Sequence, residues 1–145
     1  MTSVDFHFNA PDKVNYTCRL LRKAVGRGAK LVVMGEPALL RELDAALWTL
    51  SPTDFIAHGL MGTSPEAVLI ASPVVLAESA RGVPHHEVLV NLGAAVPEGF
   101  ERFERLIEIV TVSDEDRQVG RRRYRHYADR GYAIKTHDQA AKGVA

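Results

Sequence analysis

The sequence has few of the features that define several common protein classes. Its 145 residues contain a single cysteine, Cys18, so no disulfide bond can form within the chain, which fits a reducing compartment. No run of about 18 apolar residues occurs, and the N-terminal residues MTSVDFHFN lack the basic start and apolar segment of a signal peptide. We therefore expect a cytoplasmic protein without a membrane-spanning segment.

The chain also has no net charge, because its 18 Lys and Arg residues balance 18 Asp and Glu residues. This balance argues against a protein that coats nucleic acid with its whole surface, so an electrostatic partner must be bound locally. With 46% apolar residues the chain can fill one core of ordinary size and is too short for two. We expect one domain over residues 1–138 and a flexible tail over residues 139–145.

Motifs for cofactor binding and catalysis are missing as well. The first expected strand-to-helix connection, residues 9–13, has no glycine-rich run, and neither G-x-G-x-x-G nor a P-loop pattern occurs. The six histidines lack the spacing of metal ligands. Cys18 falls on the apolar face of an expected helix, and no nucleophile or acid–base pair is recognisable. We therefore expect no catalytic residue, no cofactor and no bound metal.

Hydrophobic periodicity predicts the fold class. Residues 4–8 alternate as a strand does, residues 13–25 carry apolar positions at helical spacing, and residues 30–35 form an apolar run typical of a buried strand. Residues 36–50 are expected to form a second helix with Pro37 in its first turn. The remaining expected elements are strands at residues 55–57, 68–71, 88–92, 106–112 and 132–135 and a helical turn at residues 100–104. This alternation predicts an α/β fold with a central, mostly parallel sheet flanked by helices on both faces.

The stretch from Ser113 to Gly131, SDEDRQVGRRRYRHYADRG, is the strongest local signal in the chain. Ser113 is a suitable N-cap, acidic residues follow in the first turn, and Gly131 suits the left-handed residue that ends a helix. Six arginines oppose one acid, Asp129, between residues 117 and 130. The sequence therefore predicts a helix that is strongly basic within a neutral chain.

Four residues of this helix lie at positions i, i+4, i+7 and i+8 and share one stripe: Arg117, Arg121, Tyr124 and Arg125. Like charges at this spacing cost a helix about 0.2–0.5 kcal/mol per pair, which a purely structural helix would avoid. A solvated face is the alternative explanation. We favour a binding site for an anion with an apolar end, and we expect Arg122 and Arg123 to point elsewhere and serve only solubility.

Trp48, the only tryptophan, lies near the end of the second expected helix and shortly before Pro52 and Phe55. From the residues alone, core packing is the favoured role for Trp48. The alternative is a partner surface, because large aromatic side chains near a helix end and a proline-containing loop are typical of interface anchors.

The order and spacing of several motifs resemble the chi subunit family of bacterial DNA polymerase III over nearly the full chain. These motifs are LDAALWTLSPTDFIAH at residues 43–58 and GRRRY at residues 120–124, followed by Tyr127, Gly131 and Tyr132. The resemblance implies a non-catalytic adaptor of the polymerase clamp loader, built as a single Rossmann-like domain without a nucleotide-binding loop.

The resemblance also implies two binding surfaces. The residues implied for the acidic C-terminal tail of single-stranded DNA-binding protein are Arg117, Arg121, Tyr124, Arg125 and, beneath the apolar end of the tail, Val110. The residues implied for the psi subunit of the clamp loader, or for a helicase partner in some bacteria, are Trp48, Pro52 and Phe55. DNA itself would be reached only indirectly.

Two alternatives from other classes stay open at the level of the sequence. The same arginines could bind nucleic acid directly, with phosphate as the anion. The third class is a small α/β enzyme or nucleotide-binding protein, which would require a cofactor for which the chain carries no motif.

Overall fold

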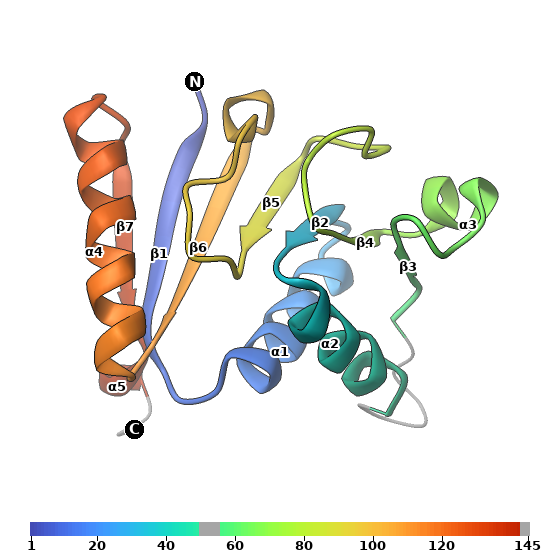
Figure 1. Ribbon diagram of the computed structural model, residues 1–145, viewed down its shortest axis with the longest axis horizontal. Helices are drawn as coiled ribbons and strands as arrows, with labels where there is room; N and C mark the ends of the chain where they lie inside the picture. Colours follow the sequence, from blue (N-terminus) through green and yellow to red (C-terminus); the bar gives the residue numbers. More distant parts are fainter. Residues whose placement is uncertain (50–55, 143–145) are drawn as a thin grey trace.

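The computed structural model describes residues 1–49 and 56–142. Within these residues the chain forms a seven-stranded sheet with the strand order β3-β4-β2-β5-β6-β1-β7, in which all neighbouring strands are parallel (Figure 1). The strands are β1 (Ser3–Ala10), β2 (Leu31–Met34), β3 (His58–Leu60), β4 (Val74–Ala77), β5 (Val88–Asn91), β6 (Arg105–Thr111) and β7 (Ile134–Asp138). The expected α/β class is confirmed, and the sheet is fully rather than mostly parallel.

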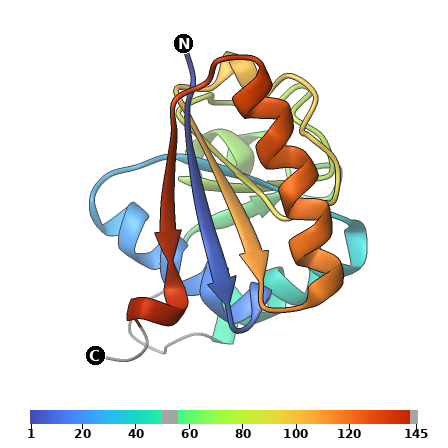
Figure 2. The same cartoon turned by 90° about the vertical axis from the view of Figure 1, so that its left-hand side faces the viewer.

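Helices cover both faces of the sheet. The helical segments in the described part of the chain are α1 (Lys13–Gly26), α2 (Pro37–Thr49), α3 (Glu66–Ala71), η1 (Phe100–Arg102), α4 (Asp114–Asp129) and α5 (Gln139–Lys142). Helices α1 and α2 pack together on one face, where Leu21 and Leu43 join the core. Helix α4 packs on the other face with Tyr127 buried, alongside β6, β1 and β7 (Figure 2). None of the described helices combines the length and the apolar composition that crossing a membrane requires.

Strand β1 has two chemically different sides. Val4 and Phe6 belong to the core beneath α4, whereas His7 on the opposite side contacts Tyr16 of α1. Alternation along a strand sends successive side chains to opposite faces, so Asp5 shares the α1 side with His7. The apolar side of β1 is therefore the one that the basic helix covers.

One expected strand is wrong, and one strand was not predicted. Residues 68–71 belong to helix α3, which follows Pro65 and begins with Glu66. A run of four apolar residues is too short to separate helix from strand by periodicity. The real strand is β4, whose residues VVLA are completely buried and follow Pro73 directly.

The ends of several other elements also differ from the expectation. The strand expected at residues 55–57 is wrong at residues 56 and 57, which precede β3, since β3 begins at His58; residue 55 lies outside the described residues. The last strand begins two residues later than expected and continues to Asp138. Residues 139–142 form α5, and residues 143–145 lie outside the described part, so the boundary of the tail stays a prediction.

Candidate functional site

The basic helix forms where the sequence predicts it. The Ser113 hydroxyl accepts a hydrogen bond from the Asp116 backbone N–H at 3.3 Å, which satisfies one of the free donors at the start of α4. Gly131, with a φ of +79°, follows the end of the helix. Both caps were read correctly from the residue types.

Asp116 ties the first turn of α4 to β6. Its carboxylate accepts hydrogen bonds from the Thr111 backbone N–H at 2.7 Å and the Thr111 hydroxyl at 3.0 Å, and lies 3.3 Å from Lys13 Nζ. Burial alone would raise the pKa of Asp116, but the Thr111 hydrogen bonds and the Lys13 charge outweigh it and hold that pKa below its ordinary value. Asp116 therefore stays ionised and anchors the helix at this end.

Gly120 lets the middle of α4 approach the sheet closely. A Cβ atom at this position would lie 2.8 Å from Val110 Cγ2 and 3.1 Å from Val110 Cγ1, which is closer than side chains tolerate. Only glycine allows the helix to lie at this distance from β6. The close contact places the residues on either side of Gly120 next to Val110.

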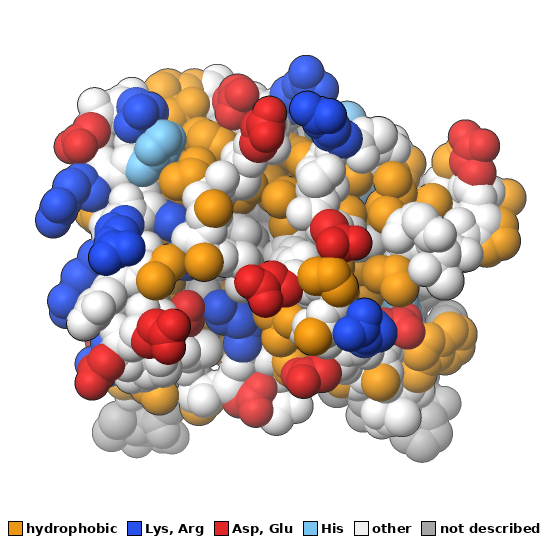
Figure 3. Space-filling model, viewed as in Figure 1, with side chains coloured by type: hydrophobic (Ala, Val, Ile, Leu, Met, Phe, Trp, Pro, Cys, Tyr) orange, Lys and Arg blue, Asp and Glu red, His pale blue; other side chains and the backbone are white. Residues whose placement is uncertain are grey.

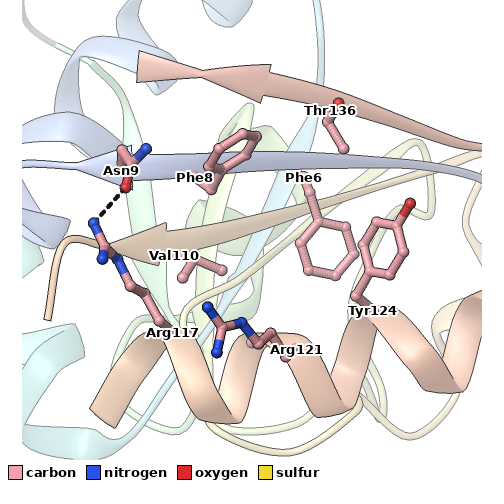
Figure 4. A pocket seen from close by; sticks show the side chains of 9 residues that line it. Phe6, Phe8, Asn9, Val110, Arg117, Arg121, Tyr124 and Thr136 are labelled. Atoms are coloured by element: carbon pink, nitrogen blue, oxygen red, sulfur yellow. Dashed lines mark hydrogen bonds between the residues drawn. The ribbon is translucent and has the colours of Figure 1, made fainter. Parts of the chain in front are cut away.

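A pocket of about 430 Å³ opens between α4 and strands β1, β6 and β7 (Figure 4). Its apolar part consists of Phe6, Phe8 and Val110 on the sheet. Helix α4 contributes Arg117 and Arg121 at one end, and at the other end the Tyr124 ring meets Phe6 edge to face at a centroid distance of 5.2 Å. The remaining lining residues are Asn9, Thr136 and Gly120. Guanidinium groups beside an aromatic floor suit a ligand with one anionic and one apolar group.

At the edge of the pocket Arg117 is hydrogen-bonded to a residue of β1. Its Nη2 donates a hydrogen bond to Asn9 Oδ1 at 2.9 Å, and Asn9 Nδ2 donates in turn to Asp138 Oδ1 at 2.9 Å. Asn9 has a φ of 60°, which is uncommon for a residue other than glycine and is best tolerated by Asn and Asp. The register of β1 against β6 shifts at this point, between His7 and Ala10.

The structure brings together four of the five residues expected to bind the anionic tail: Arg117, Arg121, Tyr124 and Val110. The fifth, Arg125, is exposed on α4 and does not line this pocket. The pocket also contains four residues that the sequence did not predict: Phe6, Phe8, Asn9 and Thr136. Alternation places Phe6 and Phe8 on one side of a strand, but the sequence does not say that α4 covers that side.

Arg123 corrects the expectation that it serves only solubility. It is 2% exposed, and its Nε donates to the Glu108 carboxylate at 2.9 Å. Tyr127 donates its hydroxyl to the same carboxylate at 2.6 Å, and the Asn91 amide donates at 3.0 Å. Burial raises the pKa of Tyr127, and the adjacent Glu108 charge raises it further, so the phenol stays protonated and keeps donating. The expectation was wrong because the sequence does not show which side of α4 packs on the sheet. Arg123 lies on that side.

The second expected surface is described only in part. Trp48 is 59% exposed, so core packing is wrong as its role. Its ring meets His58 at a centroid distance of 5.3 Å, and His58 Nε2 lies 2.7 Å from Asp44 Oδ1. Pro52 and Phe55 lie outside the described residues, so their part in this surface stays a prediction.

One group of possible metal ligands occurs among the described residues: Asp5, His7 and His137 offer donor atoms within 4.8 Å of one another. The Asp5 carboxylate already accepts hydrogen bonds from Nε and Nη2 of Arg105. A cation would have to compete with this guanidinium for the only negative charge in the group. The arrangement is therefore better explained as an ion pair that joins β1 to β6.

The fold and the pocket define a small parallel α/β protein with a pocket on one face of its sheet, lined by two arginines and an apolar floor. The chain belongs to the DNA polymerase III chi subunit family, because the family model described as "DNA polymerase III chi subunit, HolC" matches residues 1–135. Members are non-catalytic accessory subunits of the replicative polymerase holoenzyme. The expected family is confirmed.

Three curated relatives agree with this membership, each described as DNA polymerase III subunit chi. The protein from Pseudomonas aeruginosa is 30% identical over 142 residues, which cover 94% of this chain and 96% of that protein. The protein from Haemophilus influenzae is 26% identical over 121 residues and 82% of each chain. The protein from Escherichia coli is 27% identical over 95 residues, which cover 65% of this chain and 63% of that protein.

Proposed function

We propose that this protein is a cytoplasmic adaptor that binds the acidic C-terminal tail of single-stranded DNA-binding protein and links it to the polymerase clamp loader. The observation that carries the proposal is the pocket, in which Arg117 and Arg121 lie beside the apolar side chains of Phe6, Phe8 and Val110. A peptide that ends in an aromatic residue offers a ring and a free carboxylate within one residue. Such an end matches both halves of the pocket.

The charge of α4 supports the same ligand. Lys and Arg side chains gather over the side of the molecule that α4 occupies (Figure 3), and five arginines of this region are exposed: Arg117 in part and Arg121, Arg122, Arg125 and Arg130 more fully. The acidic residues that precede the aromatic end of such a tail would lie within the field of these arginines. Attraction to the whole segment would raise the rate of association more than the final affinity.

The energetics predict a weak complex. Burial of one aromatic ring contributes about 1.5–3 kcal/mol, and each hydrogen bond to a charged group contributes about 1.5–3 kcal/mol. Loss of translational and rotational freedom and ordering of the peptide offset most of this gain, which leaves an affinity on the order of micromolar. A partner with several tails would still be held firmly through avidity.

Calorimetric titration of an acidic peptide that ends in Phe with a free carboxylate tests the proposal. We expect Arg121→Ala to weaken binding about tenfold, because it removes a charged donor from the pocket. Arg122→Ala is the matched control, since Arg122 is exposed on the same helix and does not line the pocket. No binding by the unaltered protein, or equal losses in both variants, would exclude this site as the tail-binding site.

The same titration separates the adaptor from a direct nucleic-acid-binding protein. If the arginines bind phosphate instead, a bare single-stranded oligonucleotide should bind at physiological salt with micromolar or tighter affinity, and the peptide should not compete. We expect weak or no oligonucleotide binding. The apolar floor favours the peptide, because a phosphate group gains nothing from contact with apolar side chains.

We further propose that Trp48, with Pro52 and Phe55, binds the psi subunit or an alternative helicase partner. Exposure of a tryptophan to 59% is costly in water and typical of an interface anchor. Trp48→Ala should abolish co-purification of that partner and leave the peptide titration unchanged. Loss of peptide binding in this variant would mean that the two surfaces are not independent.

A further inference from the structure

The side chain of Asn9 lies on the pocket side of β1, whereas regular strand alternation predicts the opposite side. Phe6 and Phe8 line the pocket, and a regular strand would therefore turn Asn9 to the opposite face with Asp5 and His7. The left-handed backbone at Asn9 and the shift in register before Ala10 break the alternation. The side chain of Asn9 thereby reaches Arg117 of α4 (Figure 4).

Asp138 determines which way the Asn9 amide points. A carboxylate only accepts hydrogen bonds, so the NH₂ group of Asn9 must face Asp138, at 2.9 Å. The amide oxygen then faces Arg117, which can only donate, and accepts from Nη2 at 2.9 Å. One bond of the guanidinium is used in this way. The other N–H groups of Arg117 remain for a ligand carboxylate.

Asp138 also belongs to the C-terminal segment of the chain. It is the last residue of β7, where it pairs with Phe8 of β1, and its Oδ1 accepts a hydrogen bond from the Ala140 backbone N–H at 3.0 Å at the start of α5. The family model ends at residue 135, so Asp138 lies beyond the part of the chain that the model matches. The position of Arg117 is thus coupled to a segment at the far end of the sequence.

From these contacts we infer that Asn9 and Asp138 are positioning residues that hold Arg117 in the orientation that receives the terminal carboxylate of the tail. The inference rests on the proposed function of the pocket. A guanidinium that is fixed before binding loses less conformational freedom when the ligand arrives, so the relay raises affinity for the charged end of the peptide. Asp138 accordingly contributes to the binding site without lining the pocket.

The variant Asn9→Gly tests the relay with little risk to folding, because glycine adopts a φ of 60° without strain. Two peptides are titrated: the acidic Phe-ended peptide with a free carboxylate, and the same peptide with its C-terminus amidated. We expect Asn9→Gly to weaken binding of the free acid about fivefold and to leave binding of the amide unchanged. Asp138→Ala should give a smaller loss in the same direction. Asn15→Ala, at an exposed position of α1, is the control and should change neither peptide.

A double-mutant cycle shows whether Asn9 acts through Arg117. In the Arg117→Ala background, Asn9→Gly should have no further effect, because the group that it positions is gone. Full additivity of the two losses would overturn the inference. So would equal losses for the acid and the amide, since general damage to the pocket weakens both.

Two outcomes separate the inference from the proposed function. If the unaltered protein binds the free acid and Asn9→Gly binds it equally well, the relay has no role and the tail-binding proposal stands. If the unaltered protein binds neither peptide, the tail-binding proposal fails, and the inferred role of Asn9 in tail binding fails with it. Nitrogen-15 NMR of the Arg117 guanidinium without peptide then shows whether the contact itself exists, as slowed rotation that is lost in Asn9→Gly.

Discussion

At the scale of single residues, Glu108 is a buried carboxylate that the fold must supply with partners. It lies in the middle of β6 with 0% of its surface exposed, and Arg123, Tyr127 and Asn91 all donate to its carboxylate. A buried charge is costly unless it is paired and hydrogen-bonded. Helix α4 therefore contains arginines of two kinds, one that binds the helix to the sheet and others that remain available to a ligand.

Removal of Arg123 from its ion pair with Glu108 should destabilise the fold strongly. Arg123→Met leaves the Glu108 charge uncompensated, and we expect the free energy of unfolding to fall by about 3–5 kcal/mol. Denaturant titration followed by circular dichroism measures the loss. The double variant Arg123→Met with Glu108→Gln should recover part of it, because no buried charge remains. A double variant as unstable as the single one would contradict this explanation.

Gly120 gives a second prediction at this scale. In Gly120→Ala the new methyl group lies 2.8 Å from Val110 Cγ2, so α4 must shift or Val110 must change its rotamer. Overpacking of this kind costs about 1–3 kcal/mol, which exceeds the gain of about 1 kcal/mol in helix propensity. We expect lower stability in chemical denaturation and weaker peptide binding. Val110→Ala in the same chain should relieve the clash and restore stability relative to Gly120→Ala alone.

At the scale of elements, α4 shows what the sequence can and cannot predict. Its caps depend on local residue types, so Ser113 and Gly131 gave its bounds correctly. Its charge predicted an anion site, and three of the four residues of the predicted stripe line the pocket. The partners of the helix were not predictable in this way. Which side of β1 it covers is decided by the order of strands in the sheet, and the left-handed backbone at Asn9 has no signature beyond the residue type.

The dependence of local structure on the order of strands in the sheet also explains the errors at α3 and β4. Both segments are short and follow a proline, and periodicity over four apolar residues cannot separate helix from strand. The strand VVLA is distinguished by its place between β3 and β2, where it is buried on both sides. That place is a property of the sheet and not of the four residues.

The anchor of α4 to β6 should respond to pH. The pKa of Asp116 lies below its ordinary value of 3.8 in the folded protein, so its ionised form stabilises the fold above that value. This contribution is lost as the pH falls through the folded pKa, below about 3.8. The difference in the free energy of unfolding between the unaltered protein and Asp116→Asn should therefore be constant at neutral pH and shrink in acid. A difference that grows on acidification would contradict the assignment.

At the scale of the whole molecule, charge is separated although its sum is zero. Five arginines that are exposed at least in part gather along α4 and its C-cap between residues 117 and 130, whereas the acids of this helix lie in its first turn and at Asp129. Figure 3 shows Lys and Arg side chains gathered on this side of the molecule. Separation of this kind allows local attraction of an anionic partner without general affinity for polyanions. It also limits the range of the attraction, since salt screens exposed charges over about 10 Å at 0.1 M.

Peptide binding should accordingly weaken with salt. Between about 0.05 and 0.3 M sodium chloride we expect the affinity for the acidic peptide to fall several-fold, mainly through a slower association rate. Arg122→Ala, outside the pocket, should reduce the salt dependence while it changes affinity at high salt little. Stopped-flow fluorescence with a labelled peptide measures both rates. Affinity that does not change with salt would mean that the apolar contacts alone hold the peptide.

The position of β1 has a consequence for the synthesis of the protein. Val4 pairs with Leu106 on one side and with Ile134 on the other, so the first strand to leave the ribosome can complete its hydrogen bonds only when the last strand arrives. Until β6 emerges both edges of β1 stay open, and until α4 follows, Phe6 and Phe8 have no helix above them. Because the pocket takes residues from both ends of the chain, its lining is complete only when translation is nearly finished. The proposed tail binding would thus require nearly the whole chain.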